Sequence, residues 1–222
     1  MRIQFYVPHP DDLELFCGGT FLQHYHHQDN MQVLMMTRGG AGTLNWRLKG
    51  TRLEKIRTGE ATQRFALVPM AGLLWLDFQD GNVRLAPPAV HAVLSRITAY
   101  QPNMIYLPES RLGRSRYWHP DHLHTGKIVE EAARQAVRPL TLRYYHSKTA
   151  DRFVNIDPYF EANQAALRCY ASQYGINALP PFHMHALEML RKRRVKELAQ
   201  KIGCKYAEGF RELELPGSKA PA

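Results

Sequence analysis

The sequence is poor in cysteine and has no long apolar run, no low-complexity segment and no internal repeat. Its three cysteines lie far apart and lack the spacing of a metal site; they are Cys17, Cys169 and Cys204. We therefore expect buried, reduced thiols in a cytoplasmic protein, not a disulfide framework. No segment approaches the roughly 18 apolar residues that a membrane-spanning helix needs, and we expect neither a membrane span nor a signal peptide.

Acidic residues are fewer than basic ones, 20 against 29, which gives a net charge of +9. The basic residues gather in three groups: Arg47, Lys49, Arg52, Lys55 and Arg57; Arg111, Arg114 and Arg116; and Arg191 to Arg194. The third group follows an apolar stripe, so we interpret it as the solvated face of a helix. The first two flank the segments expected to line the site, and they are candidates for contact with an anionic substrate. A nucleic-acid-binding module is the alternative that explains the charge.

Apolar segments of strand length alternate with segments of helical spacing, as expected for an α/β fold. The expected strands are residues 3–7, 32–37, 72–76, 103–107 and 140–145, with a short apolar segment at 210–215. The expected helices are residues 15–27, 51–67, 88–100, 121–136, 159–172 and 182–202. This alternation predicts a Rossmann-like, doubly wound, mostly parallel sheet between two helical layers. We expect one domain over residues 1–222, with a core at 1–150, a completing part at 151–215 and a loose tail at 216–222.

Two short motifs rich in histidine and aspartate follow expected strands. His9-Pro10-Asp11-Asp12 comes directly after the first strand, and His119-Pro120-Asp121-His122 follows the fourth. With a strand order of 3-2-1-4-5 these strands are neighbours, so both motifs face the crevice at the carboxyl ends of the strands. Imidazole and carboxylate are ordinary zinc ligands, and a catalytic site needs three of them. One of Asp11 and Asp12 can then bind the ion while the other faces water.

The chain also contains histidines outside these motifs, and one rival chemistry uses the same ligand types. His24, His26 and His27 are expected to be solvated, and His183 and His185 to be surface or packing residues. A non-haem iron oxygenase also uses two histidines and one carboxylate. The alternation of strands and helices argues against the β-sandwich that such sites usually occupy, and Asp11 would have no role there.

Further motifs occur in a fixed order along nearly the whole chain. They are VPHPDDLELFCGG at 7–19, MMTRGGAG at 35–42, IRTGEA with Arg57 and Glu60, FQDGNV with Asp80, the HPDH motif at 119–122, ALRCYASQYG and YAEGF. In this order the chain resembles the LmbE-like or PIG-L-type N-acetylglucosaminyl deacetylases, and within them the bacterial branch. Leu13 stands where many members carry an acidic residue, while Glu14 fits a variant of the motif.

The resemblance implies a role for each of nine residues. The metal ligands would be His9, Asp12 and His122, holding Zn²⁺, with Fe²⁺ as the alternative ion. The catalytic residues would be Asp11 as general base, His119 at the oxyanion or the leaving amine, Asp121 as an orienting partner and Tyr117 at the oxyanion. The substrate-binding residues would be Arg57 and Asp80.

The resemblance also implies the reaction, which is hydrolysis of the acetamide of an amino sugar or a small sugar conjugate. The expected partner is a small N-acetylated sugar conjugate, with an anionic group as a further expectation. We expect no nucleic-acid partner, and we expect the protein to form a homo-oligomer. Deacylation of a non-sugar or antibiotic-type amide at the same site is the alternative.

Overall fold

A computed structural model describes residues 1–116, 119–175, 178 and 183–217. The strands are β1 (Arg2–Val7), β2 (Asn30–Thr37), β3 (Ala71–Phe78), β4 (Met104–Pro108), β5 (Leu140–Tyr145), β6 (Arg152–Asn155) and β7 (Ala207–Leu215). The helices are α1 (Asp12–Phe16), α2 (Gly18–His26), α3 (Thr51–Ala66), α4 (Pro87–Tyr100), α5 (Pro120–Arg134), α6 (Phe160–Leu167) and α7 (His183–Ala199), with the 3-10 turns η1 (Asp157–Tyr159) and η2 (Ala171–Gln173). Within these residues, no helix is both long and apolar enough to cross a membrane.

The described strands form one seven-stranded sheet in the order β3-β2-β1-β4-β5-β7-β6. The first five strands are parallel, which confirms the predicted α/β class, and their order is the 3-2-1-4-5 on which the meeting of the two motifs depends. β7 then pairs antiparallel with β5, and β6 pairs antiparallel with β7. The segment 151–215 therefore extends the sheet that residues 1–150 begin. The tail expected to be loose at 216–222 lies outside the described residues from 218 onward.

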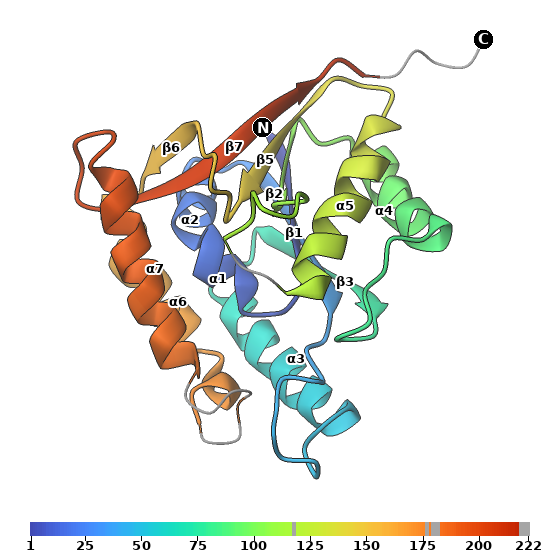
Figure 1. Ribbon diagram of the computed structural model, residues 1–222, viewed down its shortest axis with the longest axis vertical. Coiled ribbons are helices and arrows are strands. Elements are labelled where there is room, and N and C mark those ends of the chain that lie inside the picture. The colour runs from blue at the N-terminus through green and yellow to red at the C-terminus, as the bar shows by residue number, and fades with distance from the viewer. Residues whose placement is uncertain (117–118, 176–177, 179–182, 218–222) are drawn as a thin grey trace.

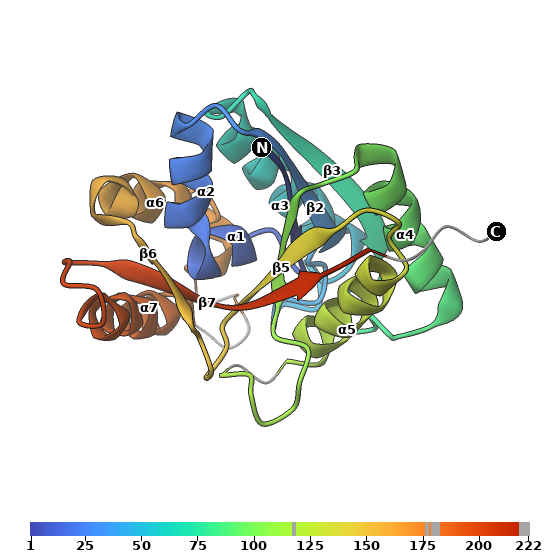
Figure 2. The same cartoon turned by 90° about the horizontal axis from the view of Figure 1, so that it is seen from above.

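Helices cover both faces of the sheet (Figures 1 and 2). On β1, Ile3, Phe5 and Val7 point to one side, where they pack with residues of α1, α2 and α3. Tyr6 points to the other side, into a second core built with α4 and α5. Because both faces are covered, β1 is buried over nearly its whole length, which is the pattern of a parallel strand.

The expected helix at 15–27 is two helices, α1 and α2, which separate at Cys17. The extended φ of −149° at Cys17 ends the first helix. The paired glycines that follow let α2 approach the C-terminal segments closely, since a Cβ at Gly18 would collide with the Asn163 amide and one at Gly19 with Ile156. The expected helix at 159–172 is likewise interrupted, with α6 between η1 and η2.

Two residues expected to face solvent are buried. His24 is 7% exposed, with its ring nitrogens 2.8 Å from Asp29 Oδ2 and 2.9 Å from the Tyr106 hydroxyl. Arg191 is 6% exposed and pairs with Glu208 at 3.7 Å, because α7 packs against β7. The interpretation of these positions as solvated was therefore wrong. The three cysteines are free thiols, as expected, but of the expected buried positions only Cys17 is buried, while Cys169 and Cys204 are partly exposed.

Candidate active site

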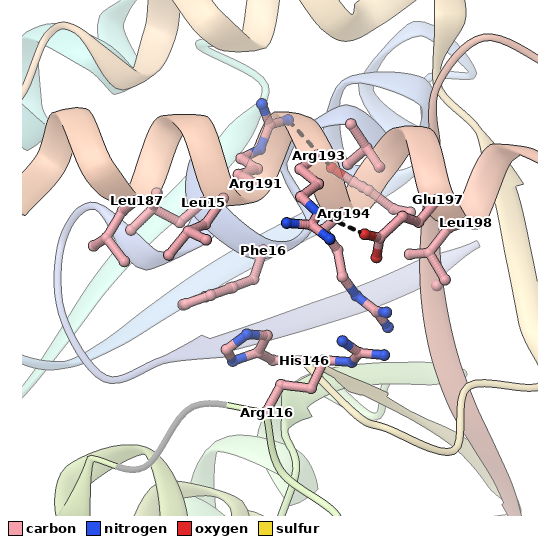
Figure 3. Close-up of a pocket in the computed structure, with 14 residues that line it drawn as sticks. Leu15, Phe16, Arg116, His146, Leu187, Arg191, Arg193, Arg194, Glu197 and Leu198 are labelled. Carbon is pink, nitrogen blue, oxygen red and sulfur yellow. Dashed lines mark hydrogen bonds and ion pairs between the residues drawn. The ribbon is translucent and has the colours of Figure 1, made fainter.

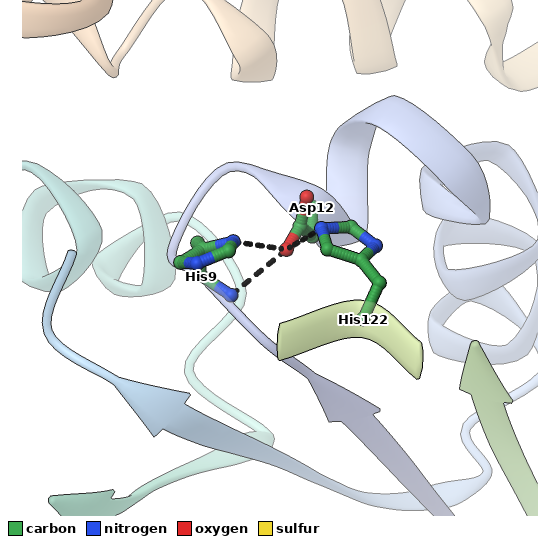
Figure 4. Close-up of side chains that lie close together, drawn as sticks. All are labelled: His9, Asp12 and His122. Atoms are coloured by element: carbon green, nitrogen blue, oxygen red, sulfur yellow. Dashed lines mark hydrogen bonds and ion pairs between the residues drawn. The ribbon is translucent and has the colours of Figure 1, made fainter. Parts of the chain in front are cut away.

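The two histidine–aspartate motifs meet at the carboxyl ends of the adjacent strands β1 and β4. Asp12 Oδ2 lies 3.1 Å from His9 Nδ1 and 3.2 Å from His122 Nε2, so one oxygen atom faces both imidazoles (Figure 4). The backbone N–H of His9 also donates to this oxygen at 2.8 Å. Asp12 and His122 are 4% exposed each. The predicted meeting of two loops more than a hundred residues apart is thus confirmed.

The first turn of each following helix fixes these side chains. Asp12 begins α1, directly after the Pro10 turn. His119 is the N-cap of α5, where its Nδ1 accepts a hydrogen bond from the Asp121 backbone N–H at 3.2 Å. Pro120 occupies the first helical position, at which a missing N–H costs nothing. Asp121 and His122 follow in the same first turn, and both are buried.

Three carboxylates surround His9. Its Nε2 lies 3.0 Å from Asp80 Oδ1 and 3.5 Å from Asp121 Oδ2, while its Nδ1 faces Asp12. Asp80 is held by the Ala41 N–H at 2.7 Å, and Asp121 by the N–H groups of Gly81 and Val83. Burial lowers the pKa of His9, but its hydrogen bonds to these carboxylates outweigh that effect and raise the pKa well above its usual range. Surroundings that favour a proton on His9 favour a metal cation in the same place.

The pKa values of two of these carboxyl groups are depressed in turn. Burial alone would raise the pKa of Asp12, yet the His122 and His9 imidazoles hold it far below its usual range. The pKa of Asp80 is also lowered, because its hydrogen bond with His9 outweighs its burial. Both groups are therefore carboxylates at neutral pH.

Asp11, the neighbour of Asp12, pairs with Arg57 on α3. Arg57 Nη2 donates to Asp11 Oδ1 at 2.5 Å, and Arg57 Nη1 donates to the Gly39 carbonyl at 3.2 Å. Gly39 has a φ of +71° and touches the guanidinium so closely that a Cβ there would overlap it. The glycine-rich loop and α3 therefore hold the carboxylate of Asp11 from one side. Adjacent Asp11 and Asp12 thus face different partners, as expected.

His119 lies beside the cluster with a defined tautomer. Its ring centroid is 5.1 Å from that of His9 and 5.6 Å from that of His122. Burial, followed by the nearby His9 and His122 rings, lowers the pKa of His119. Since Nδ1 accepts a hydrogen bond, the proton of the neutral ring is on Nε2.

A cavity of about 160 Å³ opens beside these residues. Its lining includes the predicted residues His9, Asp11, Asp12, Arg57, Asp80, His119 and His122. Asp121 lies behind His9 instead of in the lining, and Tyr117 lies outside the described residues. Sequence reasoning missed the other lining residues, which are Leu15, Phe16, Ala41, Gly42, Gly81, Gln173 and Leu187. All of these except Leu187 lie in the motifs that carry the family resemblance, and Phe16 also stands one helical turn after Asp12.

The chemistry of the donor set fits a divalent metal ion. The ligand atoms of His9, Asp12 and His122 all lie within 4.8 Å of one another. Tetrahedral zinc ligands at about 2.0–2.1 Å from the ion are about 3.3 Å apart, close to the two separations found at Asp12. His9, His119 and Asp121 also lie near enough together. In this second set His119 Nδ1 and both Asp121 oxygens accept backbone N–H groups, whereas in the first set Asp12 Oδ2 accepts one, from His9; this difference favours the first set.

Comparison with known proteins first shows the fold that the chain shares with them. The chain is similar to the solved N,N'-diacetylchitobiose deacetylase from Pyrococcus horikoshii, at 23% identity and a TM-score of 0.87. The match covers 96% of this chain and 83% of that protein's chain. A curated diacetylchitobiose deacetylase from Thermococcus kodakarensis is 24% identical over 220 residues, which cover 92% of this chain and 80% of the relative. The hydratase GalB from Pseudomonas putida KT2440 shares the fold at 17% identity and a TM-score of 0.75, covering 100% of this chain and 99% of its own. These likenesses show that the chain shares the α/β fold of these proteins.

The family follows from the sequence itself. Residues 5–133 match the model of the PIG-L family, described as GlcNAc-PI de-N-acetylase. The chain belongs to this family, as its motifs indicated. Membership makes it an amide-hydrolysing enzyme.

Proposed function

We propose that the protein is a metal-dependent N-deacetylase that removes the acetyl group from an amino sugar or a small sugar conjugate. The observation that carries the proposal is the meeting of His9 and His122 at one Asp12 oxygen, beside a cavity that Asp11 also lines. Zn²⁺ is the proposed ion, with Fe²⁺ as the alternative, since two imidazoles and a carboxylate suit both. Membership of a de-N-acetylase family supports the acetamide as the group that is cleaved.

The metal ion would be held by His9 Nδ1, Asp12 Oδ2 and His122 Nε2. When bound, it supplies positive charge that polarises the amide carbonyl and acidifies a water molecule. Asp80 and Asp121 then orient the His9 ring through its Nε2 atom. The family resemblance implied that Asp80 contacts the substrate. Because Asp80 lines the cavity, it can contact the substrate as well as His9.

Asp11 is the proposed general base, fixed in place by Arg57. Its carboxylate takes a proton from water as the oxygen attacks the acetamide carbon. His119 donates its Nε2–H to the carbonyl oxygen as negative charge develops there. The carbon–nitrogen bond then breaks, the amine nitrogen receives the proton held by Asp11, and acetate leaves. Proton transfer by a placed side chain contributes about 10²–10⁴-fold to the rate.

We further propose that residues 1–222 act as one deacetylase domain. The proposed catalytic and metal-binding residues all come from the 1–150 core, while Gln173 and Leu187 of the completing part close the cavity. A cytoplasmic location and a homo-oligomeric state stay predictions.

The test of the reaction is release of acetate from N-acetylglucosamine and N,N'-diacetylchitobiose, followed by proton NMR. The proposal expects acetate and free amine in equal amounts. Because GalB, a hydratase, has the same fold, the products must be identified and not only the loss of substrate. Substrate consumed without acetate would reject deacetylation, whereas no reaction with any acetamido sugar would remove the proposed substrate class.

A further inference from the structure

A second and larger cavity adjoins the one at the metal cluster. It has a volume of about 370 Å³, and we call it the annex; the residues that matter here are Leu15, Phe16, Arg116, His146, Leu187 and Arg194. Leu15, Phe16 and Leu187 line both cavities. The Phe16 ring is 5.6 Å from the His122 ring on one side and 4.6 Å from the His146 ring on the other. A substrate bound at the metal cluster can therefore extend past Phe16 into the annex.

The annex wall has an excess of positive charge. Four arginines line it, Arg116, Arg191, Arg193 and Arg194, against two glutamates, Glu197 and Glu208. Both glutamates are already paired, Glu197 with Arg193 at 2.9 Å and Glu208 with Arg191 at 3.7 Å. No ion pair joins Arg116 or Arg194 to a carboxylate within the described part of the chain. Two guanidinium groups thus remain for an anion.

Both of these arginines are anchored to one segment of backbone. The Arg116 N–H donates to the His146 carbonyl at 3.0 Å, and the neighbouring Ser115 forms a bridge with Ser147. Arg194 Nη2 donates to the Ser147 carbonyl at 3.1 Å. Figure 3 shows the two side chains reaching the same end of the annex, near His146. Arg194 comes from α7, so the fold brings two distant basic groups of the sequence together.

Holding two cations together is unfavourable without an anion between them. Burial, and after it the Arg116 guanidinium, lowers the pKa of Arg194 to about 10. The group is still charged at neutral pH, so the repulsion persists there. An oxyanion bound between the two side chains would relieve it and form charge-assisted hydrogen bonds with both.

We propose that Arg116 and Arg194 form a subsite for an oxyanion, a carboxylate or a phosphate, on the part of the substrate remote from the acetamide. The substrate class is then an acidic conjugate of an acetamido sugar, in which Phe16 separates the reacting amide from the charged group. The acetamido-sugar part of this substrate rests on the proposed deacetylase function. The proposal uses Arg116 of the basic group that was predicted to contact an anionic substrate, together with Arg194, which was expected to be solvated.

The kinetic test compares neutral and acidic substrates. The neutral one is N,N'-diacetylchitobiose, and the acidic ones are glycosides of N-acetylglucosamine with a carboxylate or a phosphate on the aglycone. The double variant Arg116→Gln/Arg194→Gln should lose on the order of 10- to 100-fold in kcat/KM on the acidic substrate that fits, and under threefold on the neutral one. Arg116→Lys/Arg194→Lys keeps the charge and should retain part of the preference. Arg138→Gln is the matched control, an exposed arginine outside both cavities.

Direct binding separates this subsite from the deacetylase proposal. Inorganic phosphate and succinate, measured by calorimetry, should bind wild type and His122→Ala alike, and binding should be lost in Arg116→Gln/Arg194→Gln. Unfolding temperatures of the variants within a few degrees of wild type exclude a folding defect. Anion binding without acetate release would keep the subsite and reject the deacetylase. No binding to the annex, or equal kinetic losses on neutral and acidic substrates, would overturn the subsite.

Discussion

Arg57 on α3 holds Asp11 of the HPDD motif in a buried ion pair, with Arg57 Nη2 2.5 Å from Asp11 Oδ1. The Arg57 side chain is 3% exposed and that of Asp11 is 8% exposed, so water competes little for either group. A second bond, from Arg57 Nη1 to the Gly39 carbonyl, fixes the guanidinium itself. The carboxylate proposed as general base therefore has its position set by a residue of another helix.

Replacing Arg57 should harm catalysis mainly through Asp11. Arg57→Ala frees the carboxylate, and we expect kcat to fall on the order of 10²-fold, since small displacements of a catalytic group are costly. Arg57→Lys keeps the positive charge but cannot form both hydrogen bonds of the guanidinium, so its kcat should fall less than that of Arg57→Ala. Arg52→Ala, an exposed position on the same helix, is the control. A rise in KM with kcat unchanged would instead show that Arg57 acts on the substrate.

Asp80 should act on the metal through His9. Its Oδ1 atom is 3.0 Å from His9 Nε2, and partners of this kind typically contribute 10- to 100-fold to metal affinity. Asp80→Asn should therefore raise the zinc dissociation constant by about that factor in a competition assay with a chelator. Asp77→Asn, an exposed aspartate on β3, is the matched control. Unchanged zinc affinity with a raised KM would assign Asp80 to the sugar.

Glu109 should govern part of the acid stability. It is 1% exposed and receives two bonds of 2.9 Å from Arg211 and one of 2.7 Å from the Ser147 hydroxyl. Burial would raise its pKa, but Arg211 and Ser147 outweigh burial and lower it below the usual 4.5. The native state therefore binds this proton less readily than the unfolded state. The resulting stabilisation is complete above pH 4.5 and is lost as pH falls through the native pKa.

Glu109→Gln removes that stabilisation and leaves Arg211 buried without its carboxylate. We expect the unfolding temperature at pH 7 to drop on the order of 10 °C. As the pH is lowered below 5, the unfolding temperature of the variant should fall less steeply than that of wild type. Glu214→Gln, an exposed glutamate on the same strand as Arg211, should behave like wild type. If the unfolding temperatures of wild type and Glu109→Gln fell equally steeply with decreasing pH, this account would be refuted.

Much of the sheet and the cluster followed from local patterns. The alternation of apolar strands with helices predicted the doubly wound sheet, and a strand order of 3-2-1-4-5 within it brings the two motifs, with Asp12 and His122, to the same crevice. The same alternation, with helices on both faces, also excluded a β-sandwich. These features depend on hydrophobic periodicity and on where strands end, and a single sequence displays both.

The features that the sequence did not reveal depend on packing between distant segments. The strand Arg152–Asn155 is short and pairs only with β7, so nothing local marks it. The charges of Arg191 to Arg194 indicated a solvated helix face, but Glu208 of β7 draws Arg191 inward and the Ser147 carbonyl receives Arg194. Gln173 and Leu187 reach the cavity because η2 packs against α3 and α7 packs against α1.

The most direct test of the central claim is acetate release as zinc is added back to chelated protein. The account predicts no release without metal and a rate that rises until one ion is bound per chain. Asp11→Asn should bind that ion normally and lose about 10²–10⁴-fold in rate, because it removes the base alone. Asp12→Asn should lose the ion itself, because it removes a ligand. Full activity in the metal-free protein, or normal zinc binding by Asp12→Asn, would contradict the account.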